Sequence, residues 1–377
     1  MFRGMRLLGL LILLSLLSIS TFEAIAEPIK IGAIVSQTGS AAEQGRNWLQ
    51  GVELAKAQLQ REGVPIELIT EDDGTRPAGS VSAFTKLVAQ DKVRGIVGGT
   101  WDFLAEAVAP LSQRYRVPFV TPTNPVEVFS TEARGVATFF TNGLSIRATE
   151  RSILDVLPST HEIAIALVVP NAPFGALHAE IFERLAATGK VRIVSKTVVD
   201  YAGYHDTLKA TAMKIAAQNA DIVFCLSDGS GLNLFVGELN RRRYRGWILT
   251  TQHLDEAAKL SSTPEHYRKV IGFYPRVRDE SFEGTFVAKF GHAPRVYAAE
   301  GYDALLFLAH ALEPSTDFPH RAFEIGGITG KLRFEPGQTE ISSLEAIPMV
   351  IGPSGHLESW HSKMTIDSGA DSRESPE

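Results

Sequence analysis

Short apolar runs rich in β-branched residues alternate along this chain with segments of helical periodicity, and the alternation runs through the sequence twice. Each run of the first repetition is too continuously apolar to form a sheet with one face in water. Strand, helix and strand in regular succession predict right-handed βαβ units, and hence parallel sheets with helices on both faces. The predicted fold class is therefore α/β, with two doubly wound parallel-sheet lobes.

The first set of predicted strands precedes Asn142 and the second set follows it. The first comprises residues 29–35, 66–71, 93–98 and 119–121, and the second comprises 163–169, 191–199, 222–226 and 247–250. Helical segments are expected at 174–187, 208–218, 232–242 and 297–312, and a β-rich stretch is expected around 330–334. Ser40 and Glu43 have the spacing of a capping box at the start of the first helix.

The N-terminus has the pattern of a secretory signal. Arg3 and Arg6 precede an apolar run over residues 7–19, and Ala24 and Ala26 form a small-x-small cleavage pattern. The run is shorter than the roughly 20 residues that a spanning helix needs. We therefore expect a cleaved signal peptide at 1–26 and a periplasmic mature chain. The alternative is an uncleaved membrane anchor.

Charge and cysteine content exclude several classes of function. The chain has 37 Lys and Arg residues against 43 Asp and Glu residues, so its net charge of −6 argues against nucleic acid as a partner. Its one cysteine, Cys225, lies in an apolar run and excludes an intrachain disulfide or a multi-cysteine zinc site. No HExxH, GxSxG or GxxxxGK[ST] motif occurs. We expect no catalytic residue, metal or cofactor, and hence no enzyme; the alternative is a nucleophilic Cys225 with a distant histidine.

Several short motifs then point to a known family. Residues 29–39, Gly45 and residues 51–55 resemble the first strand and helix of type I periplasmic solute-binding proteins, in particular the leucine/isoleucine/valine-binding family of ABC importers with its amide- and urea-binding relatives. Further likenesses follow in the family's order at residues 71–73 with Pro77, 96–99, 117–122, 173–175, 301–304 and 329–334. The resemblance extends from Ile29 to about Trp360.

The resemblance implies a two-lobe fold joined by three crossover strands, with a solute trapped between the lobes. It assigns residues 27–141 plus 273–330 to lobe one and 142–272 plus 331–360 to lobe two, with crossovers near 140–141, 272–273 and 332–334. Residues 361–377 are expected to form a disordered tail. A monomer is expected, with a small-molecule ligand and an inner-membrane ABC permease as its partners. The alternative is a sensor that presents its closed form to a membrane receptor or regulator.

The loop at residues 98–102 is a candidate binding element of lobe one. Free amides at a helix start attract anions, and the resemblance implies that this loop holds a ligand through its backbone and Thr100. Trp101 would stack on the ligand or pack beneath the loop. Asp102 replaces a serine of the family, so its carboxylate would repel a ligand carboxylate and accept a cationic or amide N–H. Alternatively, Asp102 is the N-cap of a helix at 103–115.

The remaining candidates come from both lobes. In lobe one, the resemblance implies head-group contacts from Thr121 and Thr123, with Ser36 and Gln44 at the rim; Thr121 alternatively bonds only nearby backbone. In lobe two, Phe174 is a lid over the ligand or a core residue, and Asp228 contacts the ligand or caps the following helix.

Gln252 or His253 lies where amino-acid binders have an acid for the ligand ammonium. That acid is absent unless Asp255 or Asp228 replaces it. The prediction is thus a small polar organic solute, with an amino acid, an amide and an aromatic acid all left open.

Overall fold

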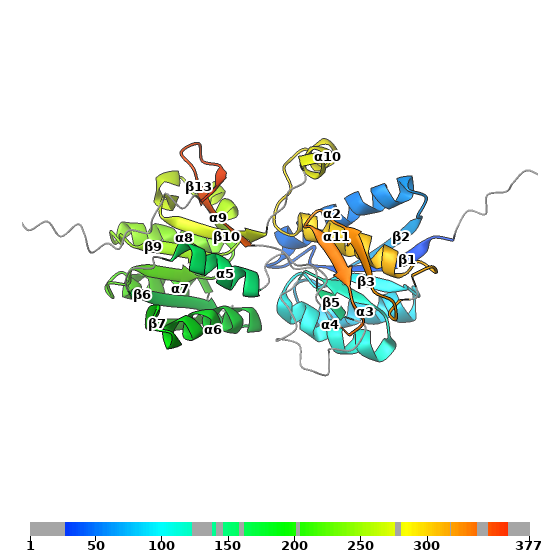
Figure 1. Cartoon of the computed structure of the whole chain (residues 1–377), viewed down its shortest axis with the longest axis horizontal. Helices are drawn as coiled ribbons and strands as arrows, with labels where there is room; N and C mark the ends of the chain where they lie inside the picture. Colours follow the sequence, from blue (N-terminus) through cyan, green and yellow to red (C-terminus); the bar gives the residue numbers. More distant parts are fainter. Residues whose placement is uncertain are drawn as a thin grey trace, which may run out of the picture.

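In a computed structural model of the chain, the described residues are 27–122, 138–140, 146–157, 162–200, 204–275, 280–316, 318–337 and 346–360. The predicted signal peptide at 1–26, the predicted tail at 361–377 and the candidate Thr123 lie outside these residues. Within them, two α/β bodies lie side by side, each built around its own sheet (Figure 1). We refer to them as the first half and the second half.

The first half contains a parallel sheet with strand order β2-β1-β3-β4-β5. Its strands are β1 (Ile29–Val35), β2 (Ile66–Asp72), β3 (Gly95–Gly98), β4 (Phe119–Thr121) and β5 (Thr138–Phe140). Its helices are α2 (Ala42–Arg61), α3 (Pro77–Ala89), α4 (Asp102–Tyr115), α10 (Glu280–Phe290) and α11 (Ala298–Ala311). Ile31 and Val35 of β1 pack in one core with α2 and α11, whereas Ile34 packs in another with α3 and α4. Helices therefore cover both faces of the sheet.

The second half contains the sheet β14-β13-β10-β9-β8-β6-β7. Its strands are β6 (Ile163–Pro170), β7 (Val191–Val199), β8 (Ile222–Cys225), β9 (Trp247–Thr250), β10 (Val270–Pro275), β13 (Ala346–Ile351) and β14 (Leu357–Ser359). Its helices are α5 (Ile146–Val156), α6 (Pro173–Ala187), α7 (Tyr204–Ile215), α8 (Gly229–Arg241), α9 (Leu254–Leu260) and the short 3₁₀ helix η1 (Pro264–Tyr267). The strands from β10 to β7 are parallel, and β13 and β14 form an antiparallel edge. Here too, helices pack on both faces.

The predicted fold class, two doubly wound parallel-sheet lobes, is confirmed by these two sheets. The division of the chain differs from the expectation in two places. Residues 273–275, expected in lobe one, belong to β10 in the sheet of the second half. The hairpin of β11 (Phe323–Gly326) and β12 (Lys331–Phe334) packs in the first half, because Leu332 and Phe334 are buried in the core that contains α11. Residues 331–334 had been expected in lobe two. Their alternating burial pattern follows a local hairpin rather than a crossover strand.

The start of α2 also differs from prediction. The helix begins at Ala42 with Ala41 as its N-cap residue, and no side chain caps it. Ser40 therefore stands one position too early for a capping box, and that prediction is wrong. Thr75 Oγ1 instead accepts the Ala41 N–H at 3.1 Å.

Two glycines bring the middle of α2 and the first turn of α11 together. A Cβ atom on Gly51 would lie 1.8 Å from the Ala298 carbonyl oxygen, and one on Gly301 would lie 2.2 Å from the Trp48 carbonyl oxygen. Real side chains cannot approach backbone so closely, so only glycine permits this helix contact. The contact places the polar N-terminal residues of both helices at the boundary between the two halves.

Candidate functional site: a cavity between the two halves

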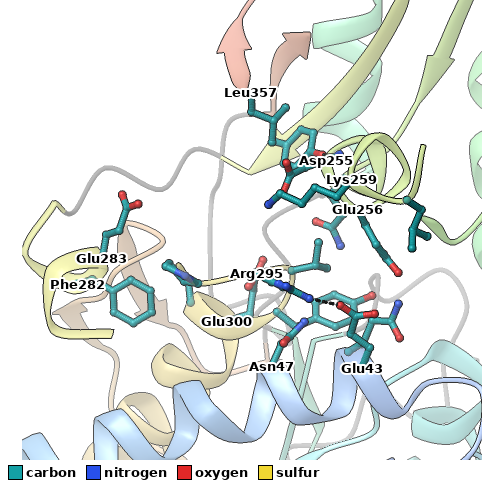
Figure 2. Close-up of a pocket in the computed structure, with 18 residues that line it drawn as sticks. Glu43, Asn47, Asp255, Glu256, Lys259, Phe282, Glu283, Arg295, Glu300 and Leu357 are labelled. Carbon is teal, nitrogen blue, oxygen red and sulfur yellow. Dashed lines mark hydrogen bonds and ion pairs between the residues drawn. The ribbon is translucent and has the colours of Figure 1, made fainter. Parts of the chain in front are cut away.

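A cavity of about 780 Å³ lies at this boundary (Figure 2). Its walls come from α2, α10 and α11 of the first half, and from α9, Tyr274 and Leu357 of the second half. Small-molecule sites in proteins have volumes of about 300–1,000 Å³. Because both halves line the cavity, a solute held in it would contact both.

Glu300 reaches the cavity from the first turn of α11 (Figure 2). Its side chain is buried, with the residue only 3% exposed. The pKa of its carboxyl group is raised to about 7, chiefly by burial and also by the neighbouring Asp303 carboxylate, while the bond from its own backbone N–H lowers it. Among the described residues, the one donor found for this carboxylate is the backbone N–H of Glu300 itself. Tyr297, the N-cap residue of α11, also lines the cavity and has a left-handed φ of 73°.

Acidic side chains outnumber basic ones in the cavity lining. The carboxylates are Glu43, Asp255, Glu256, Glu283 and Glu300, and the cations are Lys259 and Arg295. Both cations have partners within the lining: Arg295 forms an ion pair with Glu43, as the dashed line in Figure 2 shows, and Lys259 Nζ lies 2.6 Å from Asp255 Oδ2. Of the other three carboxylates, Glu256 lies 3.1 Å from His253 Nδ1. The lining therefore has an excess of negative charge.

The two halves also touch at Asp102, which is not among the residues that line the cavity. Asp102 Oδ1 accepts the Phe103 N–H at 2.9 Å, and Oδ2 accepts the Phe174 N–H at 3.0 Å. Phe174 lies in the first turn of α6, whose N-cap residue Ala172 has no capping side chain. A carboxylate of the first half thus caps a helix of the second half.

Asp102 is 7% exposed, and burial raises the pKa of its carboxyl group while the backbone N–H bonds lower it. The predicted N-cap position is wrong by one residue, because α4 begins at Asp102 and Trp101 is its N-cap residue. The side chain nevertheless accepts the amide N–H of Phe103, the second residue of the helix, and so satisfies one of its free N-terminal amides.

Three further candidates of the first half are buried in bonds within that half. Ser36 Oγ donates to Asp73 Oδ1 at 2.7 Å, and the Ser36 N–H donates to Thr100 Oγ1 at 3.1 Å. Thr121 Oγ1 donates to the Gly99 carbonyl oxygen at 3.2 Å. These bonds tie the loops that follow β1, β2 and β3 to one another and to the last residue of β4, so they position the segment that carries Asp102.

The two aromatic candidates are partly buried near this segment. The ring of Trp101 meets Phe103 nearly edge-on, with centroids 5.9 Å apart. Phe174 packs against the core of the second half, and its ring lies 4.2 Å from the His178 ring. This packing agrees with the alternative of Phe174 as a core residue, and its role as a lid over a ligand stays a prediction.

Three candidates of the second half have distinct positions. Asp228 Oδ1 accepts the Gly231 N–H at 2.7 Å and so caps α8. Gln252 is buried and lines the cavity, whereas His253 is half-buried beside the cavity residue Glu256. Gln44 of α2 also lines the cavity. Of the predicted site residues, the structure thus brings Gln44 and Gln252 together.

Sequence reasoning missed the cavity residues Glu43, Arg295 and Glu300. Glu43 was assigned to a capping box, and Arg295 belongs to a segment without periodicity. Glu300 gave one usable signal, because it is an acid near the start of the predominantly apolar helical segment 297–312. Charged residues in such a segment are rarely buried without a function or a partner.

Three further features of the described residues bear on other functions: the one cysteine, groups of metal-ligand side chains, and long apolar helices. Cys225 is fully buried in β8, and burial raises the pKa of its thiol. Across the described ranges, no group of His, Cys, Asp and Glu side chains is arranged to hold a metal ion. No helix in those same ranges combines the length and apolar character needed to cross a membrane.

Comparison with known proteins agrees with this architecture. Residues 28–361 match the family model of periplasmic binding proteins. The structure is similar to that of LivJ, a branched-chain amino acid transporter substrate-binding protein from Streptococcus pneumoniae, solved with isoleucine, at 19% identity and a TM-score of 0.74, covering 88% of this chain and 98% of that chain.

Two similar structures come from Rhodopseudomonas palustris. An ABC transporter solute-binding protein solved with 3,4-dihydroxybenzoic acid has 18% identity and a TM-score of 0.71, covering 88% of this chain and 95% of that one. Another, solved with benzoate, has 17% identity and a TM-score of 0.72, with the same coverage. A search of curated proteins finds no match.

The family match covers most of the chain, so this chain belongs to the periplasmic binding protein family. The predicted resemblance to type I solute-binding proteins and the prediction of a solute-binding function are confirmed by this membership. At identities below 20%, the individual structures establish the shared fold.

Proposed function

We propose that this chain is exported by its N-terminal signal, captures a small polar organic solute in the cavity between its halves, and delivers it to an inner-membrane ABC permease. The observation that carries the proposal is the cavity itself, because its lining comes from both halves. A solute that contacts both halves shifts their equilibrium toward the closed arrangement by its differential affinity. The solute leaves chemically unchanged.

The cavity suits a solute with polar groups and a modest apolar surface. Gln44, Gln252 and Asn47 provide amide groups, and Phe282 and Tyr297 provide aromatic surface. Isoleucine, dihydroxybenzoate and benzoate in similar proteins show that this fold accommodates both amino acids and aromatic acids.

Thermal-shift screening of the mature chain tests this function. The panel contains amino acids, amides, ureas, aromatic acids and amines, and hits are confirmed by calorimetry at one solute per chain. A ligand at 100 times its Kd stabilises the fold by about 2.7 kcal/mol, which a melting curve resolves. Small-angle scattering then measures whether the bound chain becomes more compact.

A matched pair of variants locates the site. Gln252→Ala removes an amide from the cavity and is expected to weaken binding, whereas Gln113→Ala removes an exposed amide on α4 and is expected to leave binding unchanged. Equal effects of the two variants, or no stabilising solute of any class, would contradict capture in this cavity.

A further inference from the structure

Two polar side chains of the cavity, Gln44 and Glu300, have few partners among the described residues. Gln44 is 4% exposed, and its Oε1 atom has no hydrogen-bond partner among the described residues. Glu300 is buried to the same degree, and its own backbone N–H is the one donor found for its carboxylate within the described part of the chain. Both lie in the cavity lining. A buried acceptor without a donor costs about 1–3 kcal/mol, and more when it is charged.

The cations of the lining do not fill this role. Arg295 is held by Glu43, and Lys259 is held by Asp255. Among the described residues, no ion pair within 4.0 Å reaches Glu300. Its carboxylate therefore faces the cavity without a counter-charge from these cations.

We propose that the solute carries a positively charged nitrogen, as an amine, amidine or guanidine does, and that Glu300 and the Gln44 amide receive it. The inference rests on the proposed function, because it names the class of solute for the same cavity. A cationic N–H group supplies both a donor and a counter-charge, and such charge-assisted hydrogen bonds are about twice as strong as neutral ones. The rings of Phe282 and Tyr297 add a surface that attracts cations.

An anionic solute finds no comparable position. The five carboxylates of the lining repel it, and the two cations already have partners. Helix amides that otherwise attract anions are occupied as well, because the amides at the starts of α4 and α6 donate to Asp102. The charge of the site thus separates this chain from the similar proteins solved with benzoate and dihydroxybenzoate.

Three probes of similar shape and different charge test the proposal: benzylamine, benzyl alcohol and benzoate, together with the guanidine compound agmatine. Binding to the mature chain is measured by calorimetry at neutral pH. We expect benzylamine and agmatine to bind more tightly than benzyl alcohol, and benzoate to bind least. Glu300→Gln keeps the shape of the side chain and removes its charge. It is expected to weaken the binding of both cations about tenfold and to change benzyl alcohol binding by less than about twofold.

Two further variants serve as controls for Glu300→Gln. Glu283→Gln removes an exposed carboxylate of the same cavity. It is expected to weaken the binding of benzylamine and agmatine by less than about threefold. Arg295→Gln removes one of the two cations of the lining and is expected to strengthen amine binding by about threefold, so it gives an effect of the opposite sign if Glu300→Gln does not fold.

The outcomes separate the two proposals. Benzoate or benzyl alcohol binding as tightly as benzylamine would overturn the cation assignment and leave solute capture intact. The same holds if Glu300→Gln folds and keeps full affinity for the amines. Failure of every probe here and of every solute in the wider screen would count against capture itself.

Discussion

Asp102 and Glu300 are buried acids at the boundary between the halves, and they differ in what surrounds them. Burial raises the pKa of both carboxyl groups. Asp102 accepts two backbone N–H groups, one from each half, whereas Glu300 faces a cavity. A satisfied buried carboxylate fixes a local arrangement, and an unsatisfied one is available to a ligand. The comparison therefore supports a structural role for Asp102 and the binding role that we propose for Glu300.

The largest expected effect is the loss of stability when the Asp102 side chain is removed. Asp102→Ala leaves the Phe174 amide at the start of α6 without its acceptor and removes a bond between the halves, so we expect a loss of about 3 kcal/mol in the free energy of unfolding. Urea denaturation of the mature chain measures it. Asp102→Asn retains one acceptor oxygen and is expected to lose less of the free energy of unfolding than Asp102→Ala does. If Glu300→Gln lowered the free energy of unfolding as much as Asp102→Ala does, the contrast between a structural Asp102 and a ligand-binding Glu300 would be contradicted.

The second prediction concerns pH and the Glu300 carboxyl group. Its folded pKa of about 7 lies above the ordinary value of 4.5, so the folded chain holds this proton to higher pH than the unfolded chain does. Its contribution to stability is therefore fully present below pH 4.5 and is lost as pH rises through 7. Between pH 5 and pH 8 we expect a loss of about 2 kcal/mol from this group alone.

The variant Glu300→Gln isolates that contribution. Asp303, whose pKa burial raises to about 6, changes stability in the same direction in both proteins, so its share largely cancels in the difference between them. Urea denaturation at the two pH values measures this difference. Parallel pH profiles for the parent and the variant would show that Glu300 titrates as an exposed acid and would remove one support for its binding role.

The smallest effect belongs to the rim of the cavity. Lys259 pairs with Asp255 and is more than half exposed, so Lys259→Gln should change the free energy of unfolding by about 0.5 kcal/mol or less. The same change makes the cavity more negative, so benzylamine should bind about twofold more tightly, and less so at high salt. Lys331→Gln on β12 breaks a comparable pair with Glu324 of β11 and serves as the control. Equal changes in amine affinity for the two lysine variants would show that long-range charge, not the cavity, sets the preference.

The strands of both halves could be predicted closely from the sequence. The first predicted strand coincides with β1, and those at 191–199 and 247–250 coincide with β7 and β9. β1 and β9 are buried on both faces of a parallel sheet, so a short, continuously apolar run identifies each of them, whereas the edge strand β7 is identified by its β-branched residues. The capping box at Ser40 failed because the turn before α2 uses Thr75, which lies 34 positions further along the chain.

The candidate site could be predicted only in part. Asp102 was recognised as a carboxylate at a helix start, but its bond to Phe174 joins residues that are 72 positions apart. Glu300 was missed because its burial depends on the contact of α2 with α11 through Gly51 and Gly301. The glycines are visible in the sequence, whereas the helix that each one faces is not.

The sequence by itself determined the α/β class, the two-fold repetition of the pattern and the family, because these depend on apolar periodicity and short motifs that act over a few residues. The tertiary structure alone decided which polar side chains meet at the boundary between the halves. A carboxylate acquires its role from the donors and charges around it, and those come from distant segments that only the packed chain brings together.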